Sequence, residues 1–104
     1  MSKKTPTFED VVFTKHPNIP GAISGNIILE NDYELSIVAG PSLYSTPGGL
    51  SWEGEIDDPS DVSTFEVAII NAKGQFIDET MGWQTRDQIT VSIAETAGIK
   101  NTIH

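Results

Sequence analysis

The chain has 104 residues, with 15 acidic and 6 basic side chains and a formal charge of −9. This length fits one domain with a modest core, and the charge argues against binding a nucleic-acid backbone, which requires clustered Lys and Arg. Cysteine is absent, which excludes disulfide scaffolds, thiolate nucleophiles and Cys-ligated zinc. Apolar runs such as NIILE are far shorter than the ~20 residues of a membrane span, and the N-terminus lacks the apolar segment of a secretion signal. The sequence therefore predicts a globular protein that is not membrane-embedded.

The first part of the chain predicts three strands. Residues 1–7 are expected to form a flexible tail, and the run FEDVVFT at 8–14 predicts an edge strand. The segment KHPNIPGA then interrupts regular structure through its prolines and glycine. Residues 22–29 and 33–39 predict a hairpin around the turn END, because the second arm alternates apolar and polar side chains. Gly25 marks a bulge or a close contact within the first arm.

The middle of the chain combines a long loop with a central strand. Residues 40–63 are rich in Gly, Pro, Ser and Asp, so this loop is either functional or disordered, or it contains a short strand within LSWEGEI. The run TFEVAIIN predicts a central strand with Phe65, Val67 and Ile69 on one side. AKG then turns the chain with a positive φ at Gly74, and QFI returns as a short partner strand.

Residues 81–98 carry two conflicting periodicities. Ile89, Val91 and Ile93 alternate like a strand, whereas Thr85 and Gln88 match a helix capping box and Gly98 suits a left-handed C-terminal cap. Asp87 in the first turn and Lys100 after the last turn favour the helix dipole. We therefore predict a helix over 86–97, with Trp83 folded over its start. The predicted buried stripe is Ile89, Ile93, Ala94 and Ala97, and Val91 is the test residue because a helix turns it away from that stripe.

Together these elements predict an α+β domain over residues 8–98, followed by a C-terminal tail at 99–104. Its architecture is a small antiparallel sheet of about four to five strands packed by one C-terminal helix. One helix leaves an apolar face or edge of such a sheet exposed, and pairing between copies would cover it. The sequence therefore predicts a homo-oligomer.

Two loops carry residue types that can bind a cation or a partner or take part in catalysis. Five acidic residues crowd one loop: Glu53, Glu55, Asp57, Asp58 and Asp61. Calcium binding is conceivable there, but the EF-hand spacing is not met, and a solvated loop or a partner-binding loop anchored by Trp52 and Leu50 is favoured. His16 lies in a proline-bracketed loop without the partners of a catalytic triad. We expect His16 to hydrogen-bond to the backbone, and we expect neither a metal nor a cofactor.

Arg86 is the only arginine and the best-placed contact for an anion. The predicted helix begins beside it, and free N–H groups at a helix N-terminus attract anions. Trp83 and Tyr44 could supply a stacking surface for a base or another ring. The alternative is a surface arginine paired with Asp87 or a nearby Glu, and this alternative is favoured. The predicted binding residues are Arg86, Trp83, Tyr44, Trp52 and His16.

Four segments together resemble a known group of proteins. FEDVVFTKHPNIPGA, YELSIVAGPSLYS, FEVAIINAKGQFIDET and GWQTRDQI resemble small uncharacterised accessory proteins of tailed bacteriophages, over about residues 8 to 97. Asp32 and Glu34 stand where that group usually has glycines, and the 45–63 insertion is longer. The resemblance implies phage origin and an accessory role, and it carries over no catalytic residue.

Three functional hypotheses follow. The first is a non-enzymatic protein of the host cytoplasm that inhibits a host defence or regulatory factor with a basic surface, or sequesters a signalling nucleotide. The second is a structural or assembly protein of the virion. The third, a metal-dependent hydrolase built on the acidic loop, is disfavoured. The acidic charge supports a basic protein partner better than a phosphorylated nucleotide.

Overall fold

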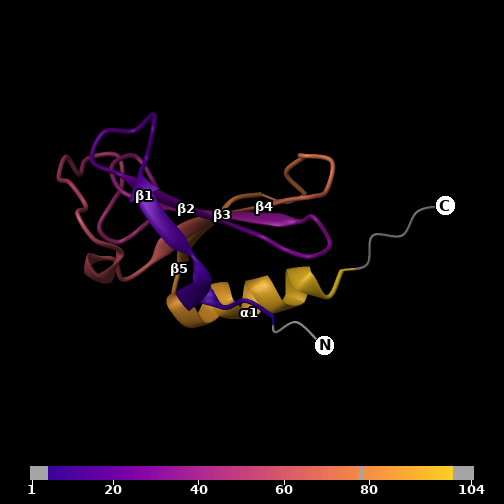
Figure 1. Cartoon of the computed structure of the whole chain (residues 1–104). Coiled ribbons are helices and arrows are strands. Elements are labelled where there is room, and N and C mark those ends of the chain that lie inside the picture. Colours follow the sequence, from indigo (N-terminus) through magenta and orange to yellow (C-terminus); the bar gives the residue numbers. More distant parts are fainter. Residues whose placement is uncertain (1–4, 78, 100–104) are drawn as a thin grey trace.

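A computed structural model describes residues 5–77 and 79–99, which form one antiparallel sheet with a helix packed on it (Figure 1). The five strands of the sheet lie side by side in chain order, from β1 to β5. The elements are η1 (Phe8–Asp10), β1 (Val12–Lys15), β2 (Ile23–Ile28), β3 (Glu34–Ala39), η2 (Pro59–Asp61), β4 (Phe65–Ile70), β5 (Met81–Gln84) and α1 (Arg86–Ala97). The predicted α+β architecture is therefore confirmed. In the described part of the chain no helix has the length and apolarity needed to cross a membrane.

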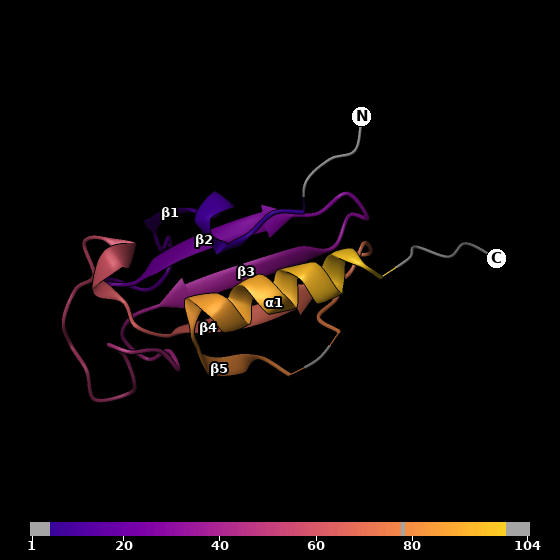
Figure 2. The ribbon, with the colours of Figure 1, turned by 90° about the horizontal axis from the view of Figure 1, so that it is seen from below.

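The two faces of the sheet differ in what covers them. Helix α1 lies along one face, in front of β3 and β4 in Figure 2. The largest fully buried side chains of the core are Phe65, Leu35, Ile37, Ile56, Ile89, Ile93, Val62 and Val67. Side chains of alternate strand positions point to the opposite face, which we call the open face. The register places these residues on it: Val12, Thr14, Ser24, Asn26, Ile28, Glu34, Ser36, Val38, Glu66, Ala68 and Ile70.

The predicted hairpin and edge strand are confirmed, with changes at their ends. β2 and β3 pair around a turn in which Asp32 has a φ of 68°. The N-terminal strand begins later than predicted, because residues 8–10 form a 3-10 turn in which Asp10 accepts a hydrogen bond from the Thr7 N–H. Gly25 makes the predicted close contact, since a Cβ there would lie 2.6 Å from Val11 Cγ1.

In the middle segment, the short strand that was one alternative for the long loop does not form, and the predicted return strand is reduced to a single bridge. No strand forms within residues 50–56. Ile56 is instead buried as a loop residue and its N–H donates to the Gly21 carbonyl. Gly74 has the predicted positive φ, at 82°. The return segment QFI pairs with β4 only through an isolated bridge between Phe76 and Ile70, so it does not form a strand.

The C-terminal helix is confirmed at its predicted bounds, 86–97. Thr85 and Gln88 form the capping box, and Val91 is 55% exposed, as a helix requires. The buried stripe was partly wrong: Ala94 is exposed and Thr96 is buried, because positions 89, 93 and 96 follow the helical repeat that faces the sheet.

The predictions for the two ends of the chain have different outcomes. The left-handed cap was wrong, since Gly98 has a φ of −80° and a ψ of −7°. Lys100 lies outside the described residues, as do most of the predicted tails at 1–7 and 99–104.

Candidate functional site

An exposed pair of aromatic rings is the most distinctive surface feature of the described chain. The ring centroids of Tyr44 and Trp83 are 5.1 Å apart and the ring planes are inclined at 35°. Tyr44 is 53% exposed and Trp83 is 59% exposed. The first comes from the long loop and the second from β5, so the fold brings together the two residues that were predicted as a stacking surface. We call Tyr44 and Trp83 the aromatic pair.

A β-bulge in β5 directs Trp83 outward. Phe65 pairs with Gln84 and Val67 pairs with Met81, so Gly82 and Trp83 together lie opposite the single residue Glu66. An extra residue of this kind bends a strand and changes the direction of a side chain. Trp83 has a φ of 51°, a left-handed conformation that is a genuine outlier for a bulky residue. Strained backbone of this kind clusters at ligand sites.

The main chain of Tyr44 is fixed on the bulge from two sides. Its N–H donates to Glu66 Oε1 at 3.0 Å, and its carbonyl accepts from the Trp83 N–H at 2.9 Å. The loop approaches so closely that a Cβ on Gly82 would lie 2.7 Å from Tyr44 Cβ. Glycine is therefore required at position 82 to bring the two rings together. This is the signal in the sequence that prediction missed: a glycine directly before a bulky aromatic residue.

The charge beside the aromatic pair is negative. Glu66 and Glu34 are the charged residues at the open-face positions of the strands, and neither Lys nor Arg occupies such a position in the described strands. Glu34 accepts a hydrogen bond from the Asn26 amide. In the described part of the chain, Glu66 uses one oxygen for the Tyr44 N–H and its other oxygen has no protein partner. The pair is thus adjoined by a carboxylate with acceptor capacity left over.

Arg86 belongs to a different, internal arrangement. Its two terminal nitrogens donate to the carbonyls of Val62 and Pro59, each at 2.7 Å. Its guanidinium carbon lies 5.2 Å from the centroid of the Phe8 ring and 5.4 Å from that of Phe65. Between the described residues the expected ion pair with Asp87 is not seen. Arg86 therefore links the start of α1 to the segment around η2, and the fold does not group it with the aromatic pair.

Trp52 and His16 also serve the fold. Trp52 is partly buried against the core, and its ring occupies the space where a Cβ of Gly54 would lie. His16 Nδ1 accepts hydrogen bonds from the N–H groups of Asn18 and Ile19, at 3.0 and 3.1 Å, as expected for a loop histidine. Neither side chain is brought to the aromatic pair.

The acidic loop pairs with Lys15 of β1 and caps its own 3-10 turn. Lys15 Nζ lies 3.0 Å from Glu55 and 3.4 Å from Asp57, and the hydrogen bond to Glu55 raises the pKa of Lys15. The backbone N–H of Ser60 donates to Asp58 and lowers the pKa of that carboxyl group. Among the described residues no group of three His, Asp or Glu side chains is arranged to hold a metal ion.

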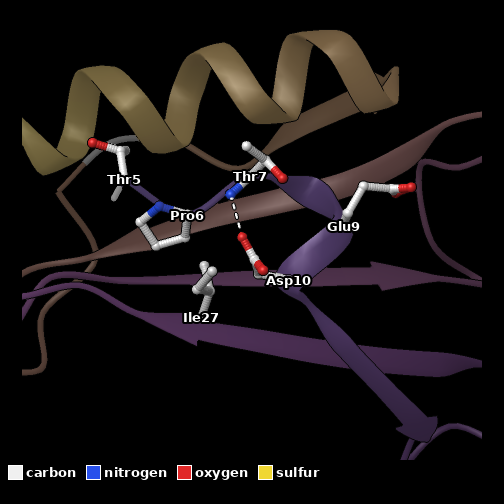
Figure 3. A pocket seen from close by; sticks show the side chains of 6 residues that line it. All are labelled: Thr5, Pro6, Thr7, Glu9, Asp10 and Ile27. Atoms are coloured by element: carbon white, nitrogen blue, oxygen red, sulfur yellow. Dashed lines mark hydrogen bonds between the residues drawn. The ribbon is translucent and has the colours of Figure 1, made fainter. Parts of the chain in front are cut away.

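A hollow of about 480 Å³ lies between the N-terminal segment and β2 (Figure 3). It is lined by Thr5, Pro6, Thr7, Glu9, Asp10 and Ile27. The Asp10 carboxylate accepts a hydrogen bond from the Thr7 N–H, whereas the Glu9 side chain points away from that hydrogen bond. Its polar groups do not converge on a common point, so the aromatic pair is the better candidate site. No family model, no curated protein and no solved structure matches the chain.

Proposed function

We propose that this protein is a non-enzymatic binding protein whose aromatic pair contacts a protein partner with a basic surface. The observation that carries the proposal is the exposed Tyr44–Trp83 pair, held outward by a bulge with a strained backbone. Exposed aromatic residues are typical anchors of protein interfaces, where Trp and Tyr dominate the binding free energy. A fold that needed these rings only for stability would bury them.

Charge supports the choice of a basic partner. The chain carries a formal charge of −9, and the carboxylate next to the pair is acidic as well. Complementary charge speeds encounter and disfavours acidic competitors. A signalling nucleotide is less well supported, because Arg86 already donates to two main-chain carbonyls and neither Lys nor Arg stands at the open-face positions of the described strands.

The biological setting is part of the same proposal. The resemblance to phage accessory proteins suggests that the partner is a host defence or regulatory factor, bound and inhibited in the host cytoplasm. Inhibition by a small acidic protein requires only that it cover a basic functional surface, and this needs no catalytic residue. Homo-oligomerisation stays a prediction, and the exposed edge strand β1 is its most accessible surface.

Differential capture from bacterial lysate tests the proposal. Tagged wild-type protein is compared with Trp83→Ala and Tyr44→Ala, and with Phe76→Ala as the matched control, since Phe76 is also an exposed aromatic residue, at 71%, and lies outside the aromatic pair. We expect basic proteins to be retained by wild type and the control and lost from both ring variants. Binding and inhibition are then measured with the purified partner.

Two results would contradict the proposal. One is capture of the same proteins by all four chains, which would place the binding surface elsewhere. The other is a thermal shift with cyclic nucleotides in the absence of any ring-dependent protein partner, which would favour nucleotide sequestration.

A further inference from the structure

The fold already contains one site at which a guanidinium lies over two aromatic rings. Phe8 and Phe65 have centroids 5.1 Å apart, with ring planes inclined at 51°. The guanidinium of Arg86 lies over both, at 5.2 and 5.4 Å, while two carbonyl oxygens accept its N–H groups. Two tilted rings with this spacing, beside oxygen acceptors, therefore bind a guanidinium in this protein.

The aromatic pair has the same ring spacing at the surface. The Tyr44 and Trp83 centroids are also 5.1 Å apart, and the ring planes are inclined at 35°. In place of the two carbonyls, Glu66 provides a carboxylate that is bonded to the Tyr44 N–H and lies opposite the bulge that carries Trp83. A carboxylate is a stronger acceptor for a guanidinium than a neutral carbonyl.

We propose that the aromatic pair and Glu66 form a receptor for an arginine side chain of the partner protein. This inference rests on the proposed function and names the chemical group that the pair binds. Arginine is preferred over lysine because its planar guanidinium stacks on aromatic faces and is less strongly hydrated than an ammonium. The arginine comes from another molecule, because Arg86 is the only arginine of the chain and already donates to the Val62 and Pro59 carbonyls.

Fluorescence titration with three peptides tests the inference. Trp52→Phe leaves Trp83 as the only tryptophan, so its emission reports on the aromatic pair. The probes are short peptides in which glycine alternates with arginine, lysine or citrulline. Lysine keeps the charge but not the plane, and citrulline keeps the shape but not the charge. We expect the arginine peptide to bind about two- to fivefold tighter than the lysine peptide, the range of an exposed cation–π contact, and the citrulline peptide not to bind.

Variants separate a built receptor from general attraction to an acidic protein. Tyr44→Ala should abolish the preference for arginine over lysine, and Glu66→Gln should weaken both charged peptides. Phe76→Ala should leave both affinities unchanged, since Phe76 is an exposed aromatic residue outside the aromatic pair. Urea unfolding checks that each variant is folded, and the shift of the Trp83 indole N–H resonance in the unsubstituted chain gives a readout that needs no variant.

Equal affinity for the arginine and lysine peptides would overturn the inference, as would an arginine preference that survives Tyr44→Ala. These outcomes are distinguishable from failure of the proposed function. If proteins are still captured through the aromatic pair while the peptides do not discriminate, only the arginine receptor fails. If capture does not depend on the rings, the proposed binding surface fails first.

Discussion

The left-handed backbone of Trp83 leads to an unusual expectation about glycine. In an ordinary strand, glycine is less stable than alanine by about 0.5–1 kcal/mol, because it loses more conformational freedom on folding. At a φ of 51° the order should reverse. A residue with a Cβ loses about 1–2 kcal/mol in this conformation and glycine loses almost nothing. We expect Trp83→Gly to be more stable than Trp83→Ala by about 0.5–1 kcal/mol.

The comparison between the two variants removes the contribution of the ring itself. Trp83 is 59% exposed, so its burial hides roughly 100 Å² of a large aromatic surface, worth at most ~2.5 kcal/mol at the usual transfer coefficient. Both variants lose this contribution equally. Wild type should therefore be more stable than either variant. The difference between Gly and Ala then isolates the backbone.

Urea unfolding of the two variants, with a matched pair at Val12, provides the measurement. Val12 is 77% exposed in the edge strand β1, so it samples an ordinary extended backbone. Alanine should be more stable than glycine at position 12 and less stable at position 83. In a domain of this size 0.5–1 kcal/mol shifts the melting temperature by roughly 2–8 °C, which thermal unfolding resolves. If alanine equals or exceeds glycine at position 83, the bulge is not strained and the reasoning fails.

Three further changes test contacts elsewhere in the fold. Arg86→Leu should lower the free energy of unfolding by about 2–4 kcal/mol, because two carbonyls lose their donor. Arg86→Lys keeps a single ammonium donor and should lower the free energy of unfolding by less. Equal stability of wild type and both variants would contradict the structural role of Arg86. Gly25→Ala should cost about 1–3 kcal/mol, since the new Cβ would lie 2.6 Å from Val11, and an unchanged urea midpoint would argue against the close contact. Asp58 has a lowered pKa because it accepts from Ser60, so it stabilises the fold above the pKa of an unfolded aspartate and this contribution is lost as pH falls through its folded pKa. The free energy of unfolding, measured as a function of pH, should therefore differ less between wild type and Asp58→Asn in acid than at neutral pH. A difference that does not change with pH would contradict this role of the Asp58 carboxylate.

The elements that were predictable are those whose signals are local. The hairpin of β2 and β3 follows from alternating side chains around a three-residue turn. The start of α1 follows from a capping box that lies within one helical turn, at Thr85 and Gln88. Here periodicity alone was ambiguous, and the capping residues decided between helix and strand. Val91, turned to solvent, confirms that choice.

The elements that were missed depend on distant partners. β5 has four residues with a bulge among them, so it shows no alternation and exists only through pairing with β4. The aromatic pair was predicted together with Arg86, but the guanidinium of Arg86 lies over the rings of Phe8 and Phe65 instead. The reason is that the helix sets the direction of Arg86, whereas the bulge sets that of Trp83. Trp83 and Arg86 are close in sequence but therefore contact different aromatic rings.

The backbone at Trp83 argues for selection on the ring itself. Asp32 and Ser42 also have positive φ, each at 68°, but small polar residues can hydrogen-bond locally and tolerate this conformation. Tryptophan gains no such compensation, and glycine at the same position would remove the strain. The ring remains more than half exposed, so its burial offsets only part of the backbone strain. A residue that breaks a local rule without an adequate stabilising return is a candidate for a binding role, and this supports the role that we propose for Trp83.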